Sequence, residues 1–172
     1  MSIRQCRPED FAVIYEVIND SAFAYKGFIP LDCWREPYMP EEELREEIGR
    51  GVVFWGWEES GALAGVTGLQ AVQDVALIRH AYVRTALRNR GIGGRLLSFL
   101  KTQTARPLLV GTWSAATWAI RFYEKHGFRL VPPEEKDGLL RRYWLVPSRQ
   151  VETSVVLADE RWFAARCVQE AR

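Results

Sequence analysis

The sequence predicts an α/β (α+β) fold in which helices flank a mixed, largely antiparallel β-sheet. Some segments repeat apolar residues at helical spacing, while others are short runs of β-branched residues bounded by turn residues. Two such runs, Val52–Trp57 and Leu63–Leu69, are joined by a short polar segment, which favours an antiparallel hairpin. The 172 residues suffice for a single domain, 1–172, and residues 159–172 form its expected C-terminal helical extension.

The remaining elements follow from local start and stop signals. Pro8, Glu9 and Asp10 are typical of a helix start, and the Ser21–Pro40 connection is rich in aromatic residues. In order, we expect strand Ser2–Arg7, a helix from Pro8, helix Glu41–Arg50, the hairpin, strand Val75–Val83, helix Gly93–Thr104, strand Leu108–Thr112, helix Ala115–His126, strand Phe128–Val131, helix Pro133–Trp144, strand Val151–Leu157 and helix Ala158–Arg172.

A glycine-rich turn between a predicted strand and a predicted helix is the strongest functional signal. Its residues are Arg88, Asn89, Arg90, Gly91, Ile92, Gly93 and Gly94. Glycines let the backbone approach a bulky ligand, and the unpaired amides of a first helical turn attract anions. The run lacks the P-loop pattern, and Leu96 stands where the dinucleotide fingerprint requires a third glycine. We therefore expect a phosphate-bearing ligand of another kind.

The charge distribution agrees with an anionic ligand. No Asp or Glu occurs from Val75 to Tyr123, so this segment carries +8 while the remainder carries −7. Coenzyme A and nucleic acid would both suit such a basic region. The overall net charge of +1 lacks the excess of Lys and Arg typical of a nucleic-acid-binding protein. We expect no nucleic-acid partner.

Two motifs together resemble the GNAT N-acetyltransferase superfamily. Arg88-x-x-Gly91-x-Gly93 is similar to its motif A, and Phe122-Tyr123 followed by Gly127-Phe128 is similar to its motif B. The resemblance implies a sheet whose two central strands splay apart, with acetyl-CoA (coenzyme A) as co-substrate and no metal. Its pyrophosphate would lie on Arg88 through Gly94, and its pantetheine arm would pair with the backbone of Ala81, Tyr82 and Val83. Phe122 joins this cofactor site.

The resemblance also assigns the chemistry. Tyr123 would protonate the leaving thiolate after a neutral amine attacks the thioester. Many family members carry Asn where this chain has Ala116, so that contact to the pantetheine is missing or supplied by Thr112, Ser114 or Thr117. The implied activity is that of an acyltransferase of the EC 2.3.1 type, in which a primary amine of a small-molecule acceptor is acetylated by direct transfer. A non-catalytic acyl-CoA-binding sensor of the same fold is the alternative.

The base that deprotonates the amine is open at this point. Asp74, His80 and a water chain are candidates, and His80 has the intrinsic chemistry for the task. Strand alternation places Arg79 and His80 on opposite faces unless a bulge intervenes, and comparison with the family favours Arg79 as the residue facing the substrate. His80 would then be a core or helix-facing residue, and Arg79 would favour an acidic substrate. The Ser21–Pro40 connection is the expected wall of the acceptor site.

Several broader expectations follow from what the sequence lacks. The three cysteines, Cys6, Cys33 and Cys167, form no metal-binding spacing, which favours free thiols and a cytoplasmic protein. No apolar run is long enough to span a membrane, so we expect no membrane partner. A homodimer is compatible with the sequence. The identity of the acceptor, the preferred acyl group and the choice between O- and N-acylation are left open by the sequence.

Overall fold

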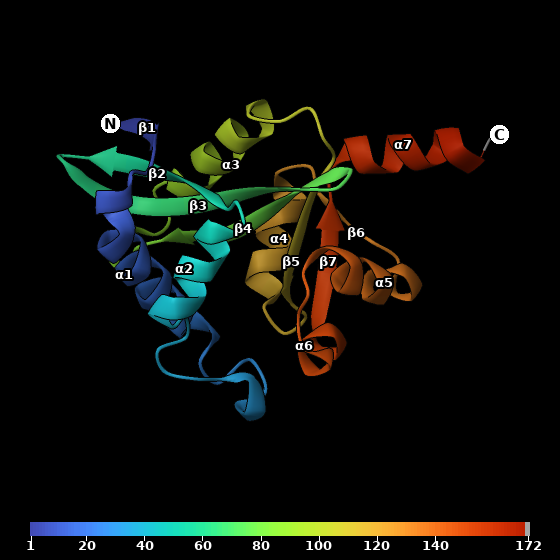
Figure 1. The fold of residues 1–172 in the computed structure, drawn as a ribbon, viewed down its shortest axis with the longest axis horizontal. Helices are drawn as coiled ribbons and strands as arrows, with labels where there is room; N and C mark the ends of the chain where they lie inside the picture. Colours follow the sequence, from blue (N-terminus) through green and yellow to red (C-terminus); the bar gives the residue numbers. More distant parts are fainter. Residues whose placement is uncertain (171–172) are drawn as a thin grey trace.

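A seven-stranded sheet with the order β1-β2-β3-β4-β5-β7-β6 forms the centre of the protein. The structure is a computed structural model that describes residues 1–170, with side chains described as far as Cys167 (Figure 1). The main elements are β1 (Ser2–Gln5), α1 (Phe11–Ala22), α2 (Glu41–Gly49), β2 (Val53–Glu59), β3 (Ala62–Val72), β4 (Val75–Val83), α3 (Ile92–Thr102), β5 (Leu108–Trp113), α4 (Thr117–Lys125), β6 (Arg129–Leu130), α5 (Pro133–Tyr143), α6 (Ser148–Thr153), β7 (Ser154–Ala158) and α7 (Glu160–Glu170).

The strand pairing confirms the predicted mixed, largely antiparallel sheet. β4 and β5 run parallel, and all the other neighbours are antiparallel. β2 and β3 form the predicted hairpin, and β4 has the predicted bounds. The parallel pair needs a crossover connection, which the glycine turn and α3 supply.

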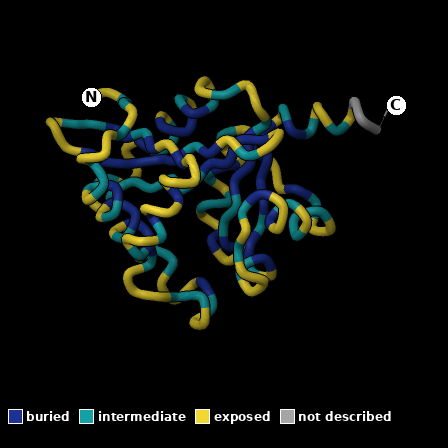
Figure 2. The backbone as a smooth tube through the Cα atoms, in the orientation of Figure 1, coloured by how far each residue is buried: buried dark blue, intermediate teal, exposed yellow. Residues whose placement is uncertain are grey.

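Helices cover both faces of the sheet (Figure 1). On one face, α1 and α2 bury Ile18 and Leu44 against β2 and β3, and α5 buries Leu140 against β5 and β7. On the opposite face, α3 and α4 bury Leu97 and Tyr123 against β4 and β5. We call the face that carries α1, α2 and α5 the acceptor face, and the opposite one the α3–α4 face. The strands between them are mostly buried, while turns are exposed (Figure 2).

The C-terminal third differs from the expected elements. The segment expected as strand Val151–Leu157 begins as helix α6 and becomes strand only at Ser154, and β6 is two residues long. Pro147 precedes α6 with an extended conformation that suits a helix start, and Val151 is buried from the helix rather than from a strand. The β-branched residues of this segment alone therefore did not distinguish a helix from a strand. The expected terminal helix is present to Glu170, and 171–172 lie outside the described residues.

Candidate active site

The glycine turn forms an anion cradle at the start of α3, where residues 88–91 are exposed. Gly91 precedes the helix with a φ of 77°, and Asn89 also has a positive φ of 63°. Glycine adopts this conformation without the penalty that a side chain brings. No side chain caps the helix, so the first amides of α3, from Ile92, Gly93 and Gly94, are available to a ligand. The macrodipole adds attraction for negative charge.

The two glycines inside α3 have a second role in packing. A Cβ on Gly93 would lie 3.4 Å from Cζ of Phe122, and one on Gly94 would lie 2.6 Å from Nε2 of His126. The His126 ring is held by a 2.7 Å contact between its Nδ1 and the carbonyl of Phe122. These glycines therefore let α3 approach α4 closely, which brings Phe122 beside the cradle.

The arginines of the turn bond to the protein rather than projecting freely. Nη2 of Arg88 donates to the carbonyl of Ser21 at 2.8 Å, and Nη2 of Arg90 pairs with Glu59 at 2.9 Å. The Ser21 hydroxyl donates to the carbonyl of Val83 at 2.6 Å. The Val83 carbonyl, at the end of the expected pantetheine-binding stretch, therefore already has a hydrogen-bond partner. Because both arginines are engaged within the protein, anion binding at the cradle depends on the backbone amides.

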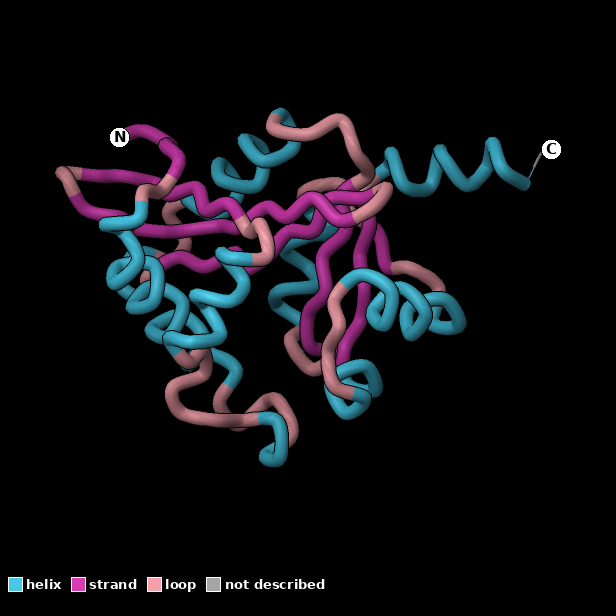
Figure 3. The backbone as a smooth tube through the Cα atoms, in the orientation of Figure 1, coloured by secondary structure: helices cyan, strands magenta, loops and turns pink. Residues whose placement is uncertain are grey.

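β4 and β5 diverge next to the cradle, as predicted. They pair only from Ala76 with Leu108 to Ile78 with Val110, although both strands continue (Figure 3). Beyond Ile78, β4 keeps β3 as its partner on one side and lacks a strand on the other. Backbone polar groups there can accept an extended ligand as an added strand. A crevice lined by Ala81, Tyr82, Gly93 and Phe122 brings four of the predicted cofactor residues together.

Tyr123 lies on the α3–α4 face beside this divergence. Its side chain is buried, and its ring meets Phe122 and Phe128 edge-on at centroid distances of 5.2 and 5.8 Å. Burial, and secondarily the charge of Tyr25, raise the pKa of the Tyr123 hydroxyl well above its usual value. The hydroxyl is therefore protonated at neutral pH and can donate a proton.

A β-bulge places Arg79 and His80 on the same face. The register changes between Val66, which pairs with Tyr82, and Gly68, which pairs with Arg79, so His80 and Ala81 together oppose Thr67. His80 has a φ of 52°, outside the ordinary strand region. Strict alternation, which separates the two side chains, does not apply here. Both contact Glu47 of α2, on the acceptor face.

Asp74 lies at the other end of β4. It accepts a hydrogen bond of 2.8 Å from the Tyr143 hydroxyl and lies 3.4 Å from Nη2 of Arg142, both of α5. The hydrogen bond from Tyr143 lowers the pKa of Asp74, and the same contact, after burial, raises the pKa of Tyr143 to about 12. The structure thus brings Arg79 and His80 together and leaves Asp74 apart from them.

The aromatic connection, residues 21–40, covers the divergence from the acceptor face. Tyr25 contacts Tyr82 at a centroid distance of 6.3 Å and Trp118 at 5.9 Å, which joins β4 to the start of α4. Nε1 of Trp113 donates to the Tyr38 hydroxyl at 2.8 Å. Ala116, where the family often has Asn, is fully buried. Aromatic rings therefore dominate this wall.

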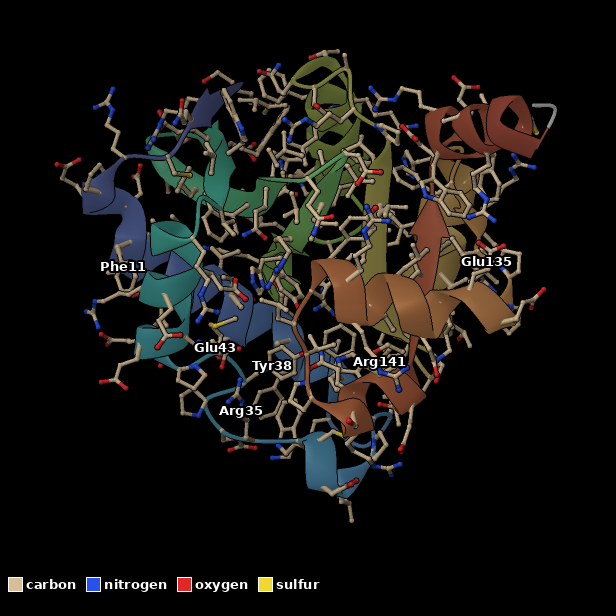
Figure 4. All side chains as sticks on the ribbon, turned by 45° about the vertical axis from the view of Figure 1, so that its right-hand side comes forward. Phe11, Arg35, Tyr38, Glu43, Glu135 and Arg141 are labelled. Carbon is tan, nitrogen blue, oxygen red and sulfur yellow. The ribbon has the colours of Figure 1, made fainter. Side chains whose placement is uncertain are left out.

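The connection is held to α2 at its other end. Arg35 pairs with Glu43 and donates from Nε to the carbonyl of Tyr38 at 3.1 Å. Figure 4 shows Arg35 and Tyr38 near Glu43 of α2. The arrangement fixes Tyr38 against Trp113.

Other classes of site find little support in the described part of the chain. Among the side chains described, as far as Cys167, no group of three His, Cys, Asp or Glu could hold a metal ion. Burial raises the pKa of the Cys6 thiol to about 12, so it stays protonated, and the described cysteines form no disulfide. None of the described helices has the length and apolar character needed to cross a bilayer.

Glu47 is the site residue that sequence reasoning missed. It lies 33 residues from His80 in the chain, on the helix predicted from Glu41 to Arg50, whose glutamates were given no role. A signal was present, because Glu47 follows Leu44 by one helical turn and therefore shares its buried face.

Comparison with known proteins places these features in a family. The sequence model of the acetyltransferase (GNAT) domain matches residues 11–141. No curated protein sequence matches the chain significantly. Among solved structures, a GNAT-family acetyltransferase of Staphylococcus aureus is similar with a TM-score of 0.66 at 20% identity, over 92% of this chain and 97% of that one.

Two further structures show the same fold. The PaiA N-acetyltransferase of Thermoplasma acidophilum, in complex with coenzyme A, has a TM-score of 0.66 and 20% identity over 92% and 99% of the two chains. The ribosomal-protein-S18-alanine N-acetyltransferase of Escherichia coli has a TM-score of 0.65 and 15% identity, over 92% of each chain.

Proposed function

Since this chain belongs to the GNAT acetyltransferase family, whose enzymes use acetyl-CoA, we propose that it transfers the acetyl group to a primary amine of a small-molecule acceptor. The transfer is direct and takes place in a ternary complex. The observation that carries the proposal is the divergence of β4 and β5 between the anion cradle and Tyr123. A thioester lying there has the Tyr123 hydroxyl as a proton donor on the α3–α4 face and the aromatic connection on the acceptor face.

The proposed chemistry uses three parts of the chain directly. Amides of the anion cradle hold the pyrophosphate, and the unpaired edge of β4 near Ala81 and Tyr82 holds the pantetheine arm. The neutral amine attacks the thioester carbonyl, the C–S bond breaks, and the Tyr123 hydroxyl gives its proton to the departing thiolate. A tyrosine whose pKa is raised by burial is suited to this role because it remains protonated until the thiolate forms.

Two observations support a small acceptor rather than a protein segment. The side chains of Arg79 and His80 are only 15% and 12% exposed, so an acceptor reaching them must enter a confined space. The aromatic connection also packs across the divergence through Tyr25 and Tyr38. Arg79 already pairs with Glu47 and Gln70, which weakens the case for an acidic acceptor.

Thermal unfolding with acetyl-CoA, free CoA, NADH and ATP tests the binding part. A ligand at 100 times its Kd should add about 2.7 kcal/mol, which raises Tm by roughly 5–10 °C in a domain of this size. Gly93→Asp should abolish the shift because it places a negative charge in the cradle. Gly138→Asp, at an exposed glycine of α5 with open space around it, is the matched control and should retain the shift.

Thiol release with a panel of aliphatic and aromatic primary amines tests the transfer part. Turnover with a small amine supports the proposal. Binding of acetyl-CoA without acetylation of any amine of the panel would instead support the acyl-CoA sensor. Absence of binding to every CoA ligand would overturn both proposed functions.

A further inference from the structure

A buried carboxylate on α2 is the starting point for a further assignment. Glu47 is 8% exposed and faces the sheet, whereas the neighbouring Glu46 of the same helix is exposed. A carboxylate is rarely buried unless its charge is compensated. Its two oxygens contact different side chains of β4, because Oε1 pairs with Arg79 and Oε2 with Nε2 of His80.

The surroundings keep Glu47 ionised. Burial alone would raise the pKa of its carboxyl, but the contacts with His80 and Arg79 outweigh burial and lower it. Arg79 is itself fixed by a 3.1 Å hydrogen bond from Nη1 to Oε1 of Gln70, whose amide donates to the carbonyl of Arg50 at 3.1 Å. A fixed negative charge therefore faces one nitrogen of the imidazole.

The His80 ring is oriented by this contact and by the bulge. An ionised carboxylate only accepts hydrogen bonds, so Nε2 carries the hydrogen, and in the neutral ring Nδ1 then presents a lone pair. The ring stacks with Phe54 and with Tyr82, at centroid distances of 6.0 and 6.3 Å. Its backbone φ of 52° is a costly conformation for a non-glycine residue, and such strain persists where the surrounding structure holds it.

His80 lies next to the divergence of β4 and β5, where the thioester is expected to bind. β4 loses β5 after Ile78, and His80 follows two residues later, on the acceptor face. Tyr123 lies on the opposite face of the same divergence. A thioester between the strands would therefore have an acid on one side and an imidazole on the other.

We propose that His80 is the base that deprotonates the acceptor ammonium, and that Glu47 is the residue that positions it. This assignment rests on the proposed acetyltransferase function. The ammonium proton moves to Nδ1 of His80, which leaves a neutral amine and an imidazolium stabilised by the Glu47 carboxylate. The amine then forms the C–N bond, the C–S bond breaks, and the thiolate receives a proton from Tyr123. His80 returns its proton to solvent, and the second amine proton restores Tyr123.

The ionisable groups around His80 are few. Glu47 contacts it from α2, Arg79 and Tyr82 flank it on β4, and β2 contributes the apolar ring of Phe54. Arg79 acts on Glu47 rather than on the acceptor. Asp74, at the far end of β4, is occupied by Tyr143 and Arg142 and has no part in the pair.

Long-range ¹H–¹⁵N NMR of the imidazole nitrogens tests the positioning without any acceptor. The chain has two histidines, His80 and His126, so the His80→Gln spectrum assigns both. We expect the Nε2–H tautomer at His80 in the wild-type protein and in Glu46→Gln, the matched control on α2. Glu47→Gln should lose the single tautomer, whereas Arg79→Gln should keep it because the Glu47–His80 contact remains. A mixed tautomer in the wild-type protein overturns the positioning role.

Kinetics with the best amine of the thiol-release panel test the base. His80→Gly suits the positive φ and leaves space for a small base. We expect it to lower kcat by about 10²-fold, to lose the rise of kcat/KM with pH, and to recover on addition of imidazole. Glu47→Gln should lower kcat by roughly 10-fold with little change in the KM for acetyl-CoA, since it leaves the cradle intact.

The outcomes separate this inference from the function on which it rests. If the wild-type protein turns over and folded His80→Gly has an unchanged kcat, the assignment of His80 as the base is overturned. The assignment is also overturned if His80→Gly is impaired and added imidazole does not restore its activity. Absence of acetyl-CoA binding or turnover in the wild-type protein overturns the proposed function itself. The acetyl-CoA thermal shift of each variant shows that it is folded.

Discussion

The anion cradle and the Glu47 cluster (Glu47, Arg79 and His80) differ in how their residues are brought together. The cradle is one continuous run of the chain, exposed from Arg88 to Gly91, and built from backbone amides at the start of α3. The Glu47 cluster is half-buried or buried, made of side chains, and assembled from α2 and β4 across 33 residues of sequence. A continuous backbone site tolerates change in its neighbours, whereas an assembled side-chain site depends on the packing of two elements.

Tyr123→Phe is the largest expected effect and tests whether binding and chemistry are separable. We expect kcat to fall by about 10²-fold because the proton donor to the thiolate is lost. The acetyl-CoA thermal shift should be unchanged because the cradle does not involve the hydroxyl. Unchanged turnover on a confirmed amine would remove Tyr123 from the mechanism, and Tyr15→Phe serves as the control for the same substitution away from the site.

Glu47→Gln tests whether the stability of the Glu47 cluster depends on the charge of its carboxylate. At neutral pH it should lower the free energy of unfolding by roughly 3 kcal/mol, because a buried ion pair loses one partner. The pKa of Glu47 is lowered in the folded protein. Its contribution is therefore full above the usual carboxyl pKa and is lost as the pH falls through the lower, folded value.

Urea unfolding between pH 3 and 8 measures this difference. The gap between wild type and Glu47→Gln should be widest near neutral pH and narrow in acid. A gap that stays constant with pH would show that the ionised carboxylate contributes nothing specific. Glu46→Gln, whose ion pair with Arg50 is exposed, is the control and should remain close to wild type.

Two alanine substitutions, at Gly138 of α5 and at Gly94 of α3, separate the effect of helix propensity from the effect of packing. Gly138→Ala should stabilise the protein by roughly 0.5–1 kcal/mol, because this helical glycine has nothing within 4 Å of the new Cβ. Gly94→Ala should lose that gain and destabilise by about 1 kcal/mol, because its Cβ would lie 2.6 Å from Nε2 of His126. Chemical denaturation measures both, and equal effects would show that α3 and α4 do not require the glycine.

Asp32→Asn is the smallest expected effect. Asp32 pairs with Arg149 of α6 at 2.7 Å and so links the aromatic connection to the α5–α6 region. Both side chains are exposed, and such pairs are screened by solvent and salt. We expect no measurable change in Tm. A clear decrease that disappears in high salt would show that this pair fixes the acceptor wall.

The sequence predicted the continuous anion cradle but not the assembled Glu47 cluster. The bounds of β4 and the location of the cradle followed from local patterns, since glycines and β-branched residues act on their own neighbourhood. The bulge at His80 and its contact with Glu47 depend on pairing with β3 and packing of α2, which no local pattern encodes. The exchange of strand for helix at Val151 has the same cause, because burial there comes from the packing of α6.

The bulge also has a consequence for insertions and deletions. Because His80 and Ala81 share one partner position opposite Thr67, His80 acts as an added residue that leaves the strand's facing order intact. Removing His80 should restore regular pairing with Tyr82 still on the acceptor face, whereas an additional residue elsewhere in β4 would reverse every side chain beyond it. We therefore expect a single-codon deletion at this position to preserve the facing order of β4 while removing the bulge, the imidazole and one partner of the Glu47 carboxylate.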